Sequence, residues 1–341
     1  MKTVWEYSHE NEAKRVLHCA HMITTGAYKV NGYKILPYQH TSTVYESIVS
    51  FPDVHYQSIP RFWERVKFIE TAILPMQVDK KLLTEVLVLL GQDYLSEPDY
   101  KSTQILWQKA EKEILAEVYK IMPSKKDFIN SITIYPTKFG PPSSFNLART
   151  KKSDIRLYLR EDQGISTITE AIITALTRPD VYDLNGMWAE SEMLTDWLIT
   201  KSSLARVLAQ YQNTKYSPTL ISVRKKQSAV LDKQSSDFYK KLGLTTSLKV
   251  FEIKNKKIYV NGLIMHNLSE RENVILKLLI QNTNNVVTFD EVYDAIHKDP
   301  DNFSLWSIAK IIQGLRDNLE ENGVSGSYIQ TMRGLGYTLK Y

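Results

Sequence analysis

Cysteine is almost absent from this sequence, since Cys19 is the only one among 341 residues. A single cysteine excludes an intramolecular disulfide and a cysteine-rich zinc module, and it is typical of a reducing compartment. No apolar run approaches the roughly 18 residues that a membrane-spanning helix needs. The first residues, MKTVWEYSHENEAKR, are too polar for a secretory signal peptide. We therefore expect a cytoplasmic protein without a membrane partner.

The sequence also has few residues arranged for catalysis. It contains no phosphate-binding loop, dinucleotide-binding fingerprint or nucleophile elbow. His18 and His21 flank Cys19, but no pair of carboxylates follows them, so we interpret them as residues of a helix surface or core. We expect no cofactor, no metal and no catalytic residue, and hence a protein that is not an enzyme. One dense charged cluster is interpreted mainly as surface ion pairs: Asp154, Arg156, Arg160, Glu161 and Asp162.

The net charge of +5 is confined to one stretch of the chain. Residues 1–211 hold 25 Lys/Arg and 25 Asp/Glu, and residues 247–341 hold 11 of each. Residues 212–246 hold seven Lys/Arg against two Asp/Glu. Such a stretch is either a solvated linker or a tether that contacts phosphates beside a DNA-binding module. In the second case Arg224, Lys225 and Lys226 are its candidate DNA contacts.

Length and patterning predict a multidomain protein. Residues 1–122 show helical periodicity, and residues 123–211 combine short strands with helices in an α+β section packed with it. Gly91 and Pro179 are expected to stop the helices that precede them. Residues 212–246 read as a basic linker with a short helix, and residues 247–341 form a separate C-terminal domain. The fold class is therefore a mostly helical N-terminal part, a small α/β (α+β) section and a compact C-terminal domain.

The C-terminal domain has the most readable pattern. LKVFEIKNKKIYVNGLIMHN alternates apolar and polar residues around two turns, which predicts a small antiparallel sheet. Ser269 and Glu272 have capping-box spacing at the start of a helix. A short helix follows from Phe289, a third helix covers residues 304–322, and a hairpin covers residues 328–341.

This order of sheet, three helices and hairpin resembles the winged helix-turn-helix domain of OmpR/PhoB-type transcriptional regulators. The resemblance covers about 95 of the 341 residues and is carried by four motifs. They are Leu268-Ser269-x-x-Glu272, Asn285-Val286-Val287-Thr288, Ile312-x-x-Leu315-Arg316-x-x-Leu319 and Ile329-x-Thr331-x-Arg333-Gly334-x-Gly336-Tyr337.

The resemblance implies binding to double-stranded DNA, with the third helix in the major groove and the hairpin, the wing, in the minor groove. Carried over position by position, the groove-facing residues of the helix are Trp306, Ser307, Lys310, Gln313, Gly314 and Arg316. Ser307 and Arg316 would hold phosphates, and Lys310 and Gln313 would reach base edges. Thr331 and Arg333 would belong to the wing.

Departures from the family pattern leave a second interpretation open. The third helix offers only Lys310 and Arg316 as cations, Gly314 stands where a basic residue is common, and Trp306 and Ile311 are apolar. In a domain without net charge, these residues also suit a protein-interaction module.

The N-terminal part lacks the pattern of a phospho-receiver domain, which opens with a buried strand that ends in paired acids. We expect it to sense a signal, to form a homodimer or to bind a protein partner.

Residues 131–200 faintly resemble a minimal zinc peptidase core. Glu170 stands at the general-base position and Glu192 where a third ligand would lie, but Thr169 and Ile173 replace both histidines. Because zinc catalysis needs two imidazoles one helical turn apart, we expect at most an inactive, pseudo-peptidase relic.

Overall fold

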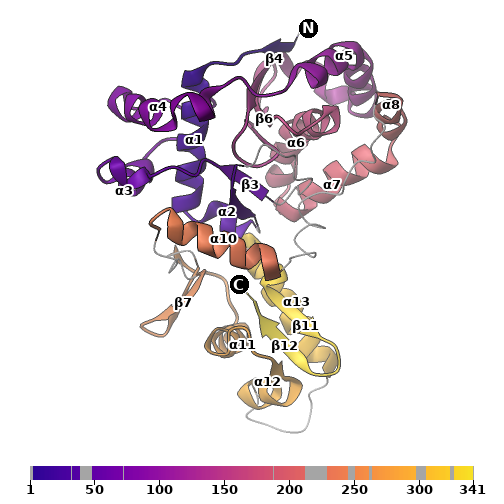
Figure 1. Cartoon of the computed structure of the whole chain (residues 1–341). Helices are drawn as coiled ribbons and strands as arrows, with labels where there is room; N and C mark the ends of the chain where they lie inside the picture. Colours follow the sequence, from indigo (N-terminus) through magenta and orange to yellow (C-terminus); the bar gives the residue numbers. More distant parts are fainter. Residues whose placement is uncertain are drawn as a thin grey trace. The chain divides into compact units, whose positions relative to one another are not determined.

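The computed structural model describes residues 3–31, 33–38, 48–71, 73–186, 188–211, 229–244, 250–260, 263–296, 305–322 and 326–340. The chain divides into two compact units (Figure 1). Residues 1–28 and 33–246 form the first unit, and residues 29–32 and 247–341 form the second.

The first unit mixes strands and helices along its whole length. Its strands are β1 (Thr3–Trp5), β2 (Lys34–Pro37), β3 (Ile48–Phe51), β4 (Ile129–Thr137), β5 (Ser143–Phe145) and β6 (Ser153–Arg160). Its helices are α1 (His9–Thr24), α3 (Phe62–Val66), α4 (Lys80–Leu95), α5 (Lys101–Ile121), α6 (Ile165–Asp183), α7 (Trp188–Lys201), α8 (Leu204–Tyr211) and α10 (Ala229–Lys241), while α2 (Ala27–Val30) holds residues assigned to both units.

The main sheet has the strand order β1-β4-β6-β5. β4 runs parallel to both β1 and β6, and β5 runs antiparallel to β6. Ile134 and Leu157 lie on the face that packs in one core with α5, α6, α7 and α8. On the opposite face the Tyr158 ring lies 4.8 Å from the guanidinium carbon of Arg15 in α1. The sheet therefore lies between α1 and a layer of later helices (Figure 1).

The expectation that residues 1–122 are helical is wrong for three segments, β1, β2 and β3. β1 pairs with β4, more than a hundred residues later in the chain, and β2 pairs in parallel with β3. Parallel pairing between short strands leaves no hairpin signal in the sequence, and this is why helical periodicity elsewhere dominated the prediction.

One of the two expected helix stops is confirmed and the other is wrong. Gly91 interrupts α4, because its φ of 58° and ψ of −172° are not helical, and a second helical segment continues from there to Leu95. α6 instead runs through Pro179 to Asp183. It continues because tertiary packing outweighs the local preference of a single residue.

The short helix expected within residues 212–246 is present as α10, but it packs into the first unit and is not part of a linker. The Ser235 hydroxyl accepts a hydrogen bond from the Ile35 backbone N–H at 3.1 Å, and Trp63 Nε1 donates to the Leu242 carbonyl at 3.0 Å. Phe238 and Leu242 are buried with α1, α3 and α4. These apolar residues make α10 an integral helix of the first unit.

The second unit contains two small sheets and a bundle of helices. Its strands are β7 (Phe251–Lys254), β8 (Lys257–Val260), β9 (Leu263–Ile264), β10 (Val287–Thr288), β11 (Ile329–Met332) and β12 (Gly336–Leu339). Its helices are α11 (Glu270–Gln281), α12 (Phe289–Ile296) and α13 (Leu305–Glu321). The sheets have the orders β7-β8-β9 and β10-β12-β11. The predicted succession of sheet, three helices and hairpin is confirmed, and β10 adds a third strand to the wing.

Capping residues fix where α11 and α12 begin. Ser269 and Glu272 form both bonds of the predicted capping box at α11. Thr288 and Glu291 repeat this arrangement at α12, because Glu291 Oε2 accepts from the Thr288 backbone N–H at 2.7 Å and Thr288 Oγ1 accepts from the Glu291 N–H at 3.2 Å. These reciprocal bonds satisfy N–H groups that a helix start leaves unpaired.

Candidate nucleic-acid interface

Helix α13 has one buried and one exposed face. Ile308, Ile312, Leu315 and Leu319, spaced four and three residues apart, lie in the core of the second unit. The exposed face carries Leu305, Trp306, Ala309, Lys310 and Gln313. The exposed face is therefore mixed, with three apolar and two polar side chains. An amphipathic helix set beside a hairpin is the arrangement with which winged helices enter a DNA groove.

Trp306 and Lys310 form a pair on this face. The Trp306 side chain is 72% exposed, and Lys310 Nζ lies 5.7 Å from the centroid of its ring. This distance is within cation–π range, and the pair is one helical turn apart. Ser307 is half-buried beside them. The lysine charge is thus held at the start of the helix, above an aromatic surface.

Gln313 is engaged with an acidic neighbour. Its Nε2 donates to Asp317 Oδ1 at 2.9 Å, across one helical turn. One donor of the amide is therefore occupied, while the carboxylate brings negative charge to the exposed face. This i,i+4 pair was readable in the sequence.

Gly314 packs against α11 rather than facing a groove. A Cβ atom at this position would lie 2.8 Å from Glu272 Oε1, the capping-box carboxylate. The expectation that Gly314 is groove-facing is therefore wrong. The same contact explains why no basic side chain occupies this position, since any side chain would displace Glu272.

Arg316 ties α13 to the wing. Its Nε and one terminal nitrogen donate to the Ile329 carbonyl at 3.1 and 3.0 Å, and the same terminal nitrogen donates to Thr331 Oγ1 at 2.9 Å. Burial lowers the pKa of the Arg316 guanidinium, an effect that Tyr337 and Asp317 oppose. Two of the predicted site residues, Arg316 and Thr331, therefore contact each other, and their bond sets the position of the wing.

The tip of the wing is a turn around Arg333, whose side chain is exposed. Gly334 follows with a φ of 74°, and a Cβ at this position would meet no atom within 4 Å, so that the turn is open to solvent. At Gly336 a Cβ would meet the Val287 carbonyl oxygen at 2.0 Å, so only glycine lets β12 approach β10. The Phe289 backbone N–H donates to the Leu335 carbonyl at 3.1 Å, which joins the turn to the start of α12.

The described residues thus bring together Trp306 with Lys310 and Arg316 with Thr331, and they leave Arg333 exposed at the tip of the wing. The candidate contacts Arg224, Lys225 and Lys226 lie outside the described residues. Acidic residues are frequent nearby: α12 contains Asp290, Glu291 and Asp294. The interface therefore has few cations with which to bind a polyanion.

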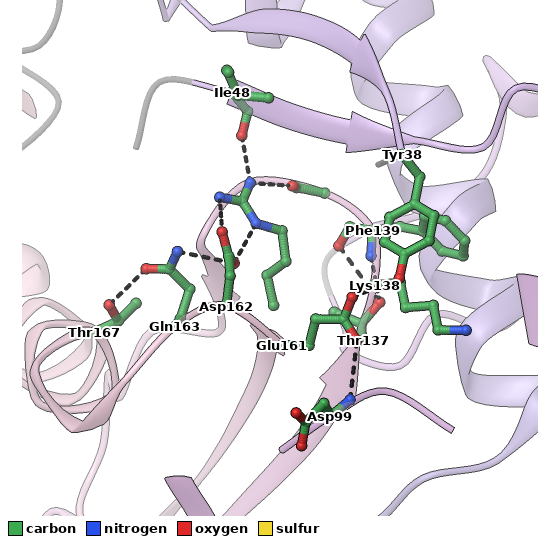
Figure 2. Close-up of polar contacts among 12 residues, drawn as sticks. Tyr38, Ile48, Asp99, Thr137, Lys138, Phe139, Glu161, Asp162, Gln163 and Thr167 are labelled. Atoms are coloured by element: carbon green, nitrogen blue, oxygen red, sulfur yellow. Dashed lines mark hydrogen bonds and ion pairs between the residues drawn. The ribbon is translucent and has the colours of Figure 1, made fainter. Parts of the chain in front are cut away.

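A second polar cluster lies in the first unit, at the carboxyl ends of β4 and β6 (Figure 2). Arg160 is 4% exposed and pairs with both carboxylate oxygens of Asp162, at 2.7 and 3.0 Å. It also donates to the carbonyls of Ile48 and Gly140 at 2.6 and 3.1 Å. The interpretation of this charged cluster as surface ion pairs is therefore wrong for Arg160.

Glu161 in the same cluster is equally engaged. It accepts from the Tyr38 hydroxyl at 2.7 Å and from the Asp99 backbone N–H at 3.0 Å (Figure 2). Because these groups satisfy one another, the cluster joins β3 and the loops that follow β4 and β6. Its chemistry is that of a structural clamp.

The faint resemblance to a peptidase core concerns strands β4 to β6 and the helices α6 and α7 that follow them. Thr169 and Ile173 are buried in α6, and the Thr169 hydroxyl donates to the Ile165 carbonyl at 2.8 Å. Glu192 forms an ion pair with Arg178. In the described part of the chain, no group of three or more His, Cys, Asp or Glu side chains is placed to hold a metal ion.

Comparisons with known proteins concern mainly the second unit. The family model "Transcriptional regulatory protein, C terminal" matches residues 265–339, which confirms the resemblance of the C-terminal domain. The nisin biosynthesis regulatory protein NisR of Lactococcus lactis subsp. lactis is 33% identical over 87 residues, which are 26% of this chain and 37% of that protein. The chain thus spans little more than a third of this relative.

Several solved structures are also similar to parts of the chain, and two of them are compared with it in turn. The DNA-binding domain of the response regulator AdeR, in complex with an intercistronic region, has 26% identity and a TM-score of 0.24, and covers 27% of this chain and 94% of that one. A structure described as "a novel family of redox sensors in the streptococci evolved from two-component response regulators" has 15% identity and a TM-score of 0.23, and covers 72% of this chain and 96% of that one. At these TM-scores neither similarity bears on function. Among the described residues, no helix has the length and apolar character needed to cross a membrane.

Proposed function

We propose that this protein is a DNA-binding transcriptional regulator, whose second unit binds duplex DNA. The observation that carries the proposal is the Arg316 clamp, which sets a hairpin beside an exposed helix face in a domain that matches a transcriptional regulatory family. Trp306, Ser307, Lys310 and Gln313 contact the major groove, and Thr331 and Arg333 contact the minor groove. Arg316 acts mainly as a positioning residue, because its donors are occupied by the wing.

Arg224, Lys225 and Lys226 supply further, sequence-independent contacts to phosphates. With a neutral second unit, these three cations account for much of the non-specific attraction. The first unit senses a signal or binds a partner, and its clamp at Arg160 and its ion pair at Glu192 support a structural rather than a catalytic role.

The test is a double charge reversal, Lys310→Glu with Arg333→Glu, in the full chain. Fluorescence anisotropy with labelled duplex DNA should show an affinity lower by about 30-fold or more, since two favourable charges become repulsive. The matched control is Lys256→Glu, which reverses an exposed charge in the turn between β7 and β8 and should change affinity little. Wild-type protein that shows no salt-sensitive binding to duplex DNA would refute the proposal.

A second candidate function is protein binding through the same face. It is supported by Trp306, Leu305 and Leu335, which are 72%, 64% and 57% exposed, and by the absence of net charge. If a protein partner is captured by wild-type protein but not by Trp306→Ala, and DNA affinity is absent, this function replaces the first. Tight DNA binding that Trp306→Ala leaves unchanged would count against it.

A further inference from the structure

Helix α7 of the first unit has a buried inner side and exposes apolar residues on its outer side. Its inner side consists of Ser191, Glu192, Thr195, Leu198 and Ile199, all of which are buried. Its outer side carries Met193, Leu194 and Trp197, which are 62%, 37% and 57% exposed. A helix on the surface of a globular unit normally keeps its outer side polar, so this side has the composition of an interface.

The apolar side is bounded by opposite charges. Glu190 and Lys201 stand four residues before Leu194 and four residues after Trp197, and both are exposed. At 3.6 residues per turn, the spacing four, three, four places all four residues in one narrow stripe. The stripe is about 16 Å long and reads acid, apolar, apolar, base from one end to the other. We call residues 190, 194, 197 and 201 the α7 stripe.

This order of charges is self-complementary. If two copies of the stripe cross antiparallel about a two-fold axis, Glu190 of each copy faces Lys201 of the other, and Trp197 faces Leu194. A parallel arrangement would instead set acid against acid and base against base. Isologous dimers require such a self-complementary surface, and buried tryptophans are frequent centres of interfaces.

We infer that the α7 stripe binds a second copy of this chain and forms an antiparallel homodimer. The inference deepens the partner-binding role proposed for the first unit. It is independent of DNA binding, because every residue of the stripe belongs to α7.

The two charges have another effect that the test must separate from dimerisation. An acid in the first turn and a base in the last turn also stabilise a helix through its dipole. If the charges act only through the helix dipole, they act within one chain, and exchanging them lowers the stability of α7. In the dimer they act between chains, and exchanging both restores complementarity.

The first experiment measures the mass of the full chain in solution without DNA, by sedimentation velocity across the micromolar range. Wild-type protein should be dimeric, and Trp197→Asp should raise the dissociation constant by about 30-fold or more. The matched control is Phe68→Asp, because Phe68 is an aromatic residue with 88% exposure outside the stripe. A monomeric wild type, or a dimer that Trp197→Asp leaves intact, overturns the inference.

The second experiment exchanges the charges. Glu190→Lys and Lys201→Glu should each weaken the dimer several-fold, and the double variant should return to within about twofold of wild type. Helix content, measured by circular dichroism, should stay unchanged in all three. A double variant weaker than both single variants means that the charges serve only the helix dipole, and this overturns the antiparallel pairing. Anisotropy with DNA is recorded separately, so that loss of DNA binding and loss of the dimer are distinguishable.

Discussion

Two helices of this protein each expose a tryptophan, and the neighbours of these two side chains are different. Trp197 on α7 is 57% exposed and Trp306 on α13 is 72% exposed. Met193 and Leu194, about one turn before Trp197, are exposed apolar side chains, while Lys201 stands one turn after it and Glu190 two turns before it. Trp306 instead has Lys310 within cation–π distance, at 5.7 Å.

This difference teaches that exposure of an aromatic ring does not by itself define a partner. An indole among apolar side chains gains most from a dry contact, whereas an indole beneath an ammonium group stays in a charged, wet surface. We therefore expect the α7 stripe to bind an apolar surface and the α13 face to bind an anion.

Salt should separate the two surfaces most strongly. Each phosphate contact contributes about −0.9 to the slope of log affinity against log salt. A fourfold rise in salt should therefore weaken DNA binding by about 10- to 100-fold for two to four contacts. The dimer should change by less than about threefold, because apolar contact dominates it. Anisotropy and sedimentation measured in the same buffers provide the comparison, and equal salt dependence of both would contradict it.

The proposed phosphate contacts of Arg224, Lys225 and Lys226 can be tested with the same plot of log DNA affinity against log salt concentration. Replacing Arg224, Lys225 and Lys226 with glutamine should reduce the slope by about 2 to 3 if all three contact phosphates. The dimer constant should not change. A slope identical to that of wild type would show that this segment is a linker only.

Replacing each tryptophan with alanine, one at a time, tests directly whether the two surfaces have different partners. Trp306→Ala should lower DNA affinity by about 3- to 10-fold, through loss of the platform that holds Lys310, and leave the dimer intact. Trp197→Ala should weaken the dimer and leave the DNA affinity of each chain nearly unchanged. Each variant is the control for the other. A variant that impairs both activities equally would show that the two surfaces are not independent.

Local chemistry made the second unit predictable. The start of α11 could be predicted from a capping box within four residues, Ser269 to Glu272. The buried face of α13 could be predicted from the spacing of its apolar residues, which are Ile308, Ile312, Leu315 and Leu319. The first unit was harder, because β1 pairs with a strand far away in sequence and so carries no local signal. The sequence predicted a short helix within residues 212–246 but not its packing, because the Lys residues of α10 masked the buried apolar pair Phe238 and Leu242.

The candidate site was predictable in its residues but not in their contacts. The motif places Arg316 and Thr331 at known positions, yet only the structure shows that they bond to each other. The collision that excludes a side chain at Gly314 involves Glu272 from another helix, so spacing along the chain could not reveal it. The α7 stripe could not be predicted from the sequence either. Only the structure shows that the opposite side of α7 is buried, so that the stripe is the side exposed to solvent.

The two units differ as well in the ionisable groups that they bury. Glu12 and His18 of α1 are 1% and 7% exposed. Burial raises the pKa of Glu12 to about 7, while the Lys138 backbone N–H, Lys138 and Arg15 oppose this rise. Burial, together with Arg15 and His21, lowers the pKa of His18 to about 3. In the described part of the second unit, the carboxylate of Glu272, which is 9% exposed, accepts from the Ser269 backbone N–H at 2.9 Å and from the Ser269 hydroxyl at 2.7 Å.

The smallest expected effect is therefore a pH dependence of the first unit in which two opposite contributions nearly cancel. Glu12 stabilises the fold most below its unfolded pKa and loses this contribution as pH rises towards 7, whereas His18 contributes above its unfolded pKa and loses its contribution as pH falls. Between about pH 4.5 and 6.5 the two slopes oppose each other. Glu12→Gln removes one of them, so the stability of the variant should rise with pH by up to about 1.4 kcal/mol per unit, and that of His18→Gln should fall. Urea unfolding of both variants and the wild type across this range measures the slopes. If Glu12→Gln and wild type have the same slope, Glu12 does not bind a proton in the folded protein at these pH values.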